Sequence, residues 1–289
     1  MGIAERGYTH WQGTLDPNRR PWRPIARQGI RLSLKRKFFK PLLSFSLVPA
    51  LVFAAGVYFS ERIGDFEKMF RGADRFLKIN PEYFKNYYAS GFLLFMMLVI
   101  MIVSGAGLVA DDLRHNALPL YFSRPLRKRD YIGGKFLSLA AFLLALTLAP
   151  GIVFIILKLI FSGSFKFLAD YPWLPFSVVG WSVVVSSFFS LYTLLMSSLG
   201  RNRRYAMILM LSVYFISDVF FAIFMGMFHE PAFALVSIEM NLGQIAAAMM
   251  GAKPRWDVPW VYSAFILAAI AGFAARVLYR KIRATEVIR

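Results

Sequence analysis

The segment Asp111–Lys135, DDLRHNALPLYFSRPLRKRDYIGGK, lies between two long apolar runs. It carries six Lys or Arg residues, two prolines and a Gly-Gly pair. The runs on either side are Ala89–Ala110 and Phe136–Phe161. Each is long enough for a helix to cross the roughly 30 Å hydrocarbon core of a bilayer. The segment is therefore predicted to connect two membrane spans.

Four more apolar runs reach a similar length: Pro41–Ser60, Pro175–Leu199, Tyr205–Phe228 and Val258–Tyr279. Apolar residues make up 58% of the 289-residue chain, above the roughly 45–50% of soluble domains. We therefore predict an all-α, polytopic membrane protein with six transmembrane helices. An even number of spans places both termini on one side of the membrane.

Positive charge is concentrated on one side of the predicted spans. The N-terminal tail, Asp111–Lys135, the Arg201–Arg204 connection and the segment from Arg276 hold 24 of the 34 Lys and Arg residues. Since basic loops stay in the cytoplasm, both termini are predicted to be cytoplasmic. The formal charge of +18 is spread over these four segments, which argues against a nucleic-acid partner.

This topology divides the chain into three parts. Residues 1–40 form a cytoplasmic tail and an amphipathic elbow helix, for which Ile25–Phe39 has the mixed apolar and basic pattern of a helix on a lipid surface. Residues 41–279 form the transmembrane domain with the cytoplasmic loop 111–135, and residues 280–289 form a cytoplasmic tail. On the opposite side, Glu61–Lys78 is expected to be a short amphipathic helix. Pro231–Met250 is expected to be a broken hairpin of two short helices before the last span.

Within the loop, two carboxylates follow directly after an apolar run. Asp111 and Asp112 are unfavourable at the C-terminus of a helix, so they are predicted to begin a new one. Pro119 is expected to kink that helix or to divide it in two. Leu120 and Tyr121 would lie on one face and give a soluble partner an amphipathic helix to bind. The alternative is a solvated basic loop beside lipid headgroups.

Asp218 lies well inside the fifth run, with Tyr214 one helical turn away. A carboxylate at that depth costs roughly 2.5–3.5 kcal/mol and needs a partner or a cavity. It either lines a translocation path or hydrogen-bonds to a serine-bearing neighbouring helix. The fourth span offers a stripe that includes Ser186 and Ser190, although such a stripe is more typical of close helix packing. The stripe is Ser182, Ser186, Ser190, Thr193 and Ser197.

Motifs for catalysis do not appear in the sequence. There is no P-loop, so ATP and Mg²⁺ are expected to bind elsewhere. The histidines His10, His115 and His229 lie on three separate segments, and the chain has no cysteine. No metal site and no enzymatic activity of its own are therefore predicted.

The loop resembles the first cytoplasmic loop of ABC transporter permeases of the type-2 exporter class. The resemblance rests on Asp112, Ala117, Leu118, Pro119, Leu120, Tyr121, Ser123, Arg124 and Pro125, followed by Arg129, Asp130, Tyr131, Gly134 and Lys135. It implies a plasma-membrane permease that works as a dimer, with a second copy or a related permease, beside a separate ATPase subunit. The coupling residues it implies are Asp111, Asp112, Leu118, Pro119, Leu120, Tyr121, Ser123, Arg124 and Pro125. Along the spans, Asp218, Tyr214, Ser186 and Ser190 are the candidates for the translocation path.

Two other functions remain open at this point. The first is a membrane-embedded enzyme that uses Asp218, or Asp111 and Asp112, to hold Mg²⁺ against a lipid-type substrate. The second is a passive channel or scaffold. The sequence does not identify a transported substrate.

Overall fold

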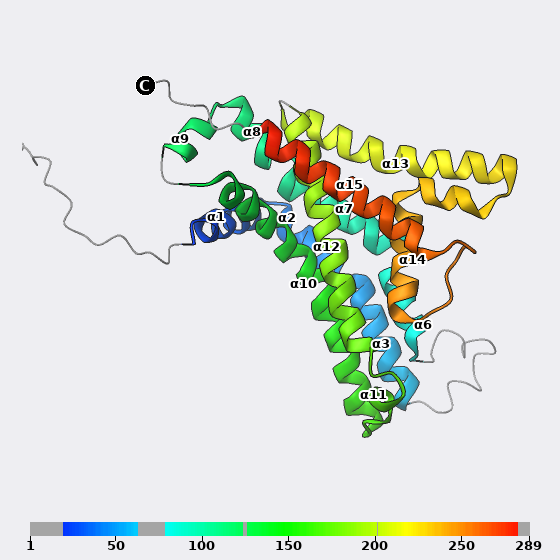
Figure 1. Cartoon of the computed structure of the whole chain (residues 1–289). Helices are drawn as coiled ribbons and strands as arrows, with labels where there is room; N and C mark the ends of the chain where they lie inside the picture. Colours follow the sequence, from blue (N-terminus) through cyan, green and yellow to red (C-terminus); the bar gives the residue numbers. More distant parts are fainter. Residues whose placement is uncertain (1–19, 63–78, 124–125, 201, 283–289) are drawn as a thin grey trace, which may run out of the picture.

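The computed structural model describes residues 20–62, 79–123, 126–200 and 202–282, and these residues form helices joined by short connections, with no strand among them (Figure 1). The first helices are α1 (Trp22–Leu34), α2 (Phe39–Ser46), α3 (Val48–Arg62), α6 (Pro81–Tyr88), α7 (Gly91–Gly105), α8 (Gly107–Arg114) and α9 (Leu118–Phe122). The later ones are α10 (Lys128–Ser162), α11 (Lys166–Asp170), α12 (Leu174–Leu199), α13 (Arg203–Phe228), η1 (Pro231–Val236), α14 (Ile238–Met250) and α15 (Trp260–Lys281).

The six predicted spans are confirmed in the described part of the chain. Six helical stretches are long and apolar enough to cross a membrane: Phe39–Ser60, Gly91–Arg114, Lys128–Ser162, Leu174–Leu199, Arg203–Phe228 and Trp260–Lys281. The side of the membrane on which the termini lie stays a prediction. The outer amphipathic helix expected at Glu61–Lys78 falls almost wholly outside the described residues.

The third span begins eight residues earlier than predicted, at Lys128. Its N-terminus is capped because the Asp130 carboxylate accepts a hydrogen bond from the Arg127 backbone N–H at 3.2 Å. The Gly133-Gly134 pair that suggested a loop is helical. The connection between the second and third spans is correspondingly shorter than residues 111–135.

Gly134 serves the packing of α1 against α10. A side chain at Gly134 would lie 2.6 Å from Cβ of Ile25, whereas Gly133 has nothing within 4 Å. Across the same contact, a side chain at Gly29 would lie 2.7 Å from Cβ of Ser138. Small residues let two helices approach closely. The predicted elbow helix is thus present as α1, and it is held against the start of the third span.

Helix α10 is the centre of the bundle and packs against α1, α3, α7, α12 and α15. Pro150 lies inside it and has no N–H, so the carbonyl of Leu146 loses its helical partner. The Tyr87 hydroxyl donates to that carbonyl at 2.9 Å, and Tyr88 donates to the carbonyl of Thr147 at 3.0 Å. The Tyr87 hydroxyl of α6 therefore replaces the hydrogen bond that Pro150 removes from this buried span.

Helices α3, α10 and α12 run side by side, while α13 and α15 diverge from them with α6 and α14 in the angle between (Figure 1). The predicted broken hairpin is confirmed as η1 followed by α14. Ser237 separates the two helices and caps α14 by accepting a hydrogen bond from the N–H of Met240 at 3.0 Å.

Candidate functional site

The second span bends at Ala106 and continues as α8 up to Arg114. Ser197 of α12 stabilises the bend, since its hydroxyl donates to the carbonyl of Ala106 at 2.8 Å and accepts from the N–H groups of Val109 and Ala110 at 3.0 Å each. Beyond Ala106 the helix continues as α8 into the polar residues that end at Arg114.

The prediction that Asp111 and Asp112 begin a new helix is wrong. Both lie in the last turn of α8, where the helix dipole disfavours a carboxylate. Nearby cations offset this cost. The Asp112 carboxylate forms an ion pair with Lys135 at 2.9 Å and accepts a hydrogen bond from the Tyr131 hydroxyl at 2.6 Å.

The new helix is α9, which begins at Leu118 and has Pro119 in its first turn. Proline is tolerated in the first turn of a helix because the N–H it lacks would have no helical partner there. Division of the segment into α8 and α9 is one of the two outcomes expected of Pro119. Asn116 takes a left-handed conformation with φ of 49°, and the N–H of Ala117 donates to the carbonyl of Asp112 at 2.9 Å. The chain therefore turns sharply between the two helices.

Helix α9 has an anchored face and an exposed face. Leu118 is buried beside Tyr131 and Ile282, so α9 lies on the start of α10 and the end of α15. The ring of Tyr121 packs edge-on against Tyr131 with centroids 5.2 Å apart. Leu120 is 75% exposed at the opposite face. A one-turn helix thus presents a leucine away from the bundle while two neighbours hold it in place.

Lys135 is the charged centre beneath α9. It is 7% exposed, and its ammonium donates to the carbonyl of Leu108 at 2.9 Å in addition to pairing with Asp112. The same group lies 5.8 Å from the ring centre of Tyr121 and 5.4 Å from that of Tyr131. Burial and the nearby Asp112 raise the pKa of Tyr121. We call Asp112, Tyr131 and Lys135 the α9 brace.

The other residues predicted for this surface are more varied. Burial and the neighbouring Arg203 lower the pKa of Arg36, and the nearby Asp111 opposes this shift without reversing it. Pro119 and Ser123 are exposed, and the Ser123 hydroxyl donates to the carbonyl of Leu120 at 2.9 Å. Arg124 and Pro125 lie outside the described residues.

Asp218 belongs to a second polar cluster, at the broken hairpin. Its carboxylate accepts a hydrogen bond from the Ser237 hydroxyl at 2.5 Å. The expectation that the serine-bearing neighbour would be the fourth span is wrong, because this serine lies between η1 and α14. Tyr214 donates to the Glu239 carboxylate at 3.1 Å. Burial raises the pKa of Glu239, and Asp218 raises it further.

Glu239 is the member of this cluster that sequence reasoning missed as a site residue. Ser237 followed by an acid two residues later is the pattern of a helix N-terminus, where a carboxylate is favourable. That pattern could have placed Glu239 at the start of a helix. It could not have shown that α13 brings Tyr214 to it.

The hydroxyl stripe of α12 is buried along its length. Thr193 packs against Gly105, where a side chain would collide with its methyl group, as expected of close helix packing. Ser182 donates to the carbonyl of Val178 at 2.7 Å. Within the described residues, the hydroxyls of Ser186 and Ser190 have no hydrogen-bond partner. The structure therefore does not join them to Asp218 by hydrogen bonds.

Among the described residues, no three His, Asp or Glu side chains come together as a metal site would require. Asp111 and Asp112 contact cations and a tyrosine instead of each other, which is unlike a shared metal site.

No curated protein matches this chain. A family model described as ABC-2 family transporter protein matches residues 17–275. The match includes α1, all of the loop that carries α9, and most of the last span. It covers well over half of the chain and agrees with the six apolar helices. The chain therefore belongs to the ABC-2 family of transporter proteins, as a membrane permease component.

Proposed function

We propose that this chain is the membrane-spanning subunit of an ATP-driven exporter, and that it binds a separate ATPase subunit through α9. ATP and Mg²⁺ bind to that partner. Both chain termini and α9 face the cytoplasm, and the membrane is the plasma membrane. Family membership supports the permease role, and the distribution of Lys and Arg supports the orientation.

The observation that carries the proposal is the position of Leu120. Leu120 is 75% exposed on a polar connection, where a partner with an apolar surface could cover it. The adjacent Pro119 is exposed as well, so the two residues form a small apolar surface on α9. A short helix of this kind fits an apolar groove on a soluble subunit.

Contacts beneath α9 give a route by which movement reaches the spans. Leu118 packs against Tyr131 of α10, and the brace ties α8 to α10. Ile282 ties the end of α15 to the same contact, and Lys128 lies 5.6 Å from the ring centre of Tyr279. A push on α9 would therefore act on the second, third and sixth spans together. This is how ATP-driven closure of the partner would change the bundle.

We also propose that the permease pairs with a second copy or a related permease. Helix α13 exposes a long apolar face, including Ile208 at 61%, Val219 at 55% and Met227 at 67%. Lipid can cover such a face, but a two-fold pore places some spans against a partner. For the path, the Tyr214 and Asp218 cluster adjoins a cavity of about 290 Å³ lined by Glu239. The unsatisfied hydroxyls of Ser186 and Ser190 remain candidates deeper in the bundle.

The test is co-purification of the detergent-solubilised full chain with an ATP-hydrolysing subunit. Leu120→Asp is expected to lose the subunit, because a carboxylate would be buried in an apolar contact. Leu120→Met keeps an apolar side chain and should retain it. Leu199→Asp places the same charge on another exposed leucine, which is 48% exposed and close in sequence to Ser197 beside α8.

Leu120 is preferable to Tyr121 for this experiment, since Tyr121 also packs inward on Tyr131. Recovery of the ATPase with Leu120→Asp at the level of the unchanged protein would rule out α9 as the docking surface. Failure of every form to recover an ATPase would count against the permease–ATPase assembly itself.

A further inference from the structure

Two arginine side chains from separate elements lie near each other where the first, second and fifth spans meet. Arg36 is in the turn between α1 and α2, and Arg203 is the first residue of α13. The two guanidinium groups are close enough for their charges to interact, and Asp111 of α8 lies close to Arg36 as well. Gly107 of α8 makes room for this group, since a side chain there would collide with the Asp111 carboxylate and lie 3.4 Å from Cδ of Arg203. We call Arg36, Asp111 and Arg203 the arginine cluster.

Both arginines have buried nitrogen atoms that make no hydrogen bond. Within the described residues, Nη1 of Arg36 and Nε of Arg203 have no acceptor. Arg203 reaches one acceptor with another nitrogen, since its Nη2 donates to the carbonyl of Val103 at 3.4 Å. A buried donor without an acceptor costs about 1–3 kcal/mol, and a charged donor costs more. An acceptor placed between the two guanidinium groups would remove this cost.

The charges of the arginine cluster do not balance. Burial and the charge of Arg203 lower the pKa of Arg36, so the repulsion between the two cations is only partly offset by Asp111. Among the described residues, Asp111 forms no ion pair with either arginine. Two guanidinium groups and one carboxylate leave one positive charge in excess. A phosphodiester carries one negative charge and accepts hydrogen bonds, so it would satisfy both the charge and the donors.

The arginine cluster lies at the edge of the apolar surface. Phe38, two residues after Arg36, is 75% exposed, and Tyr205, two residues after Arg203, is 66% exposed. Exposed apolar side chains beside basic ones mark the depth at which acyl chains give way to headgroups. On the topology proposed above, this is the cytoplasmic leaflet, where basic pockets between spans bind anionic headgroups. These neighbours favour a lipid over a free anion.

We propose that the arginine cluster binds the phosphodiester group of an anionic phospholipid, with the phosphate between Arg36 and Arg203. A guanidinium presents its N–H donors in a fixed plane that matches the oxygens of phosphate. The bound lipid would join the turn before the first span to the start of the fifth span, beside α8. It would therefore stabilise the end of the bundle from which α9 projects.

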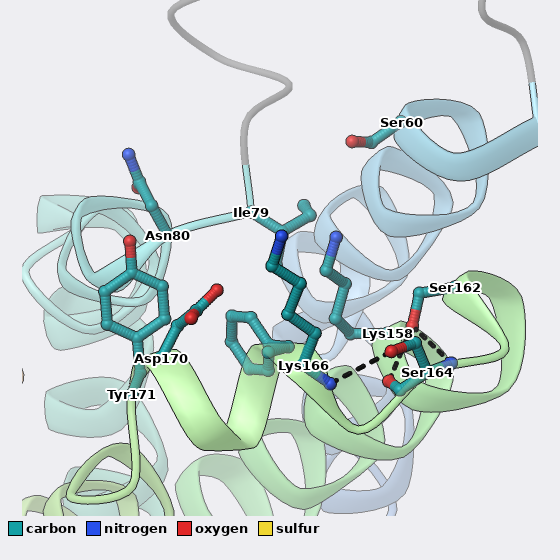
Figure 2. Close-up of a pocket in the computed structure, with 10 residues that line it drawn as sticks. Ser60, Ile79, Asn80, Lys158, Ser162, Ser164, Lys166, Asp170 and Tyr171 are labelled. Atoms are coloured by element: carbon teal, nitrogen blue, oxygen red, sulfur yellow. Dashed lines mark hydrogen bonds between the residues drawn. The ribbon is translucent and has the colours of Figure 1, made fainter.

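A second group of cationic side chains lies at the other end of the bundle and provides a control. Figure 2 shows a cavity of about 500 Å³ between the ends of α3 and α10, with Lys158, Lys166 and Asp170 in its walls. Within the described residues, neither of these lysine nitrogens is a buried atom without a hydrogen-bond partner. This cavity therefore lacks the feature that marks the arginine cluster.

The test is native mass spectrometry of the delipidated full chain in detergent with added phosphatidylglycerol. The double variant Arg36→Gln/Arg203→Gln is expected to bind at least about tenfold less lipid, since two charged donors are lost. Arg36→Gln alone keeps the contact of Arg203 with Val103 and should lose at least about threefold, which keeps the test decisive if the double variant does not fold. Arg204→Gln removes an exposed charge next to the cluster and should leave binding unchanged, as should Lys166→Gln at the other end.

Equal lipid binding by the unchanged protein and the Gln variants of the cluster, all folded in a thermal unfolding assay, would overturn the proposal. So would a loss of binding in Lys166→Gln as large as in the double variant, because the site would then lie in the cavity of Figure 2. Equal binding of diacylglycerol, which has no phosphate, would overturn the role of the arginines. Displacement of phosphatidylglycerol by millimolar inorganic phosphate would overturn the lipid assignment. Asp111→Asn should strengthen binding of this anionic lipid, and weaker binding would contradict the charge balance of the cluster.

Discussion

Substitution of Asp112 by Ala should loosen the contact between α8 and α10 on which α9 rests, without unfolding the spans. The substitution removes the ion pair to Lys135 at 2.9 Å and the acceptor of the Tyr131 hydroxyl at 2.6 Å. It also leaves the ammonium of Lys135, which is 7% exposed, with its hydrogen bond to the carbonyl of Leu108. Helix α9 is five residues long and depends on packing against Tyr131, whose hydroxyl loses its acceptor in this variant.

The size of the effect follows from the burial of the pair. Removal of one partner from a buried ion pair costs about 3–5 kcal/mol, and the lower figure applies because the Asp112 side chain is 17% exposed. A loss of about 3 kcal/mol corresponds to roughly a 100-fold rise in the population of the opened state. Asp112→Asn keeps a hydrogen-bond acceptor and loses only the charge, so its effect should be smaller.

The assay is hydrogen–deuterium exchange of the detergent-solubilised protein, read by mass spectrometry over residues 117–123. Amide exchange there reports local opening. The matched control is Glu82→Ala, which removes an exposed ion pair with Lys85 at 2.9 Å. Such pairs contribute only about 0–1 kcal/mol, and no change over α9 is expected. Exchange over α9 that rises less than about threefold in Asp112→Ala would refute the brace.

Three further predictions concern packing and protonation. Gly134→Leu should overpack the contact with α1, cost about 1–3 kcal/mol of stability and so lower the thermal midpoint. Gly133→Leu meets open space and should leave the midpoint unchanged. Gly105→Leu should destabilise the contact between the second and fourth spans, whereas Gly272→Leu on α15, with nothing within 4 Å, should leave the midpoint unchanged; equal midpoints for the pair would contradict close packing there. Because its pKa is raised in the folded state, Glu239 contributes stability that is present at low pH and lost as the pH rises through the folded pKa. Glu239→Gln should therefore raise the midpoint more at pH 8 than at pH 5, and an equal gain at both would contradict the raised pKa.

The spans and the elbow helix could be predicted because they depend on the length and pattern of apolar runs, which are local properties of the chain. The start of α10 could not, since Gly133 and Gly134 have the composition of a turn. In the structure Gly134 instead makes room for Ile25 of α1, a contact that is distant in sequence. Tertiary packing overrides local propensity at this point.

The site residues show the same division. Pro119 divides the helical segment, which was one of the two predicted outcomes, because proline restricts the backbone in a known way. The expectation that Leu120 and Tyr121 share one face is wrong, since Tyr121 packs inward on Tyr131 while Leu120 is 75% exposed.

The placement of Asp111 and Asp112 was wrong because the second span continues beyond Ala106 as α8 to Arg114, where Ser197 of another span bonds the backbone at the break. The partner of Asp218 was assigned to the wrong segment, since no sequence pattern links α13 to Ser237.

The most direct test of the central claim uses the absence of cysteine from the chain, so that a single introduced thiol reports one position. Leu120→Cys in native membranes should form a maleimide cross-link to a subunit that carries a P-loop, identified by mass spectrometry. Ile160→Cys, which is 65% exposed at the far end of α10, should not. An ATPase adduct at position 160 and none at position 120 would contradict coupling through α9.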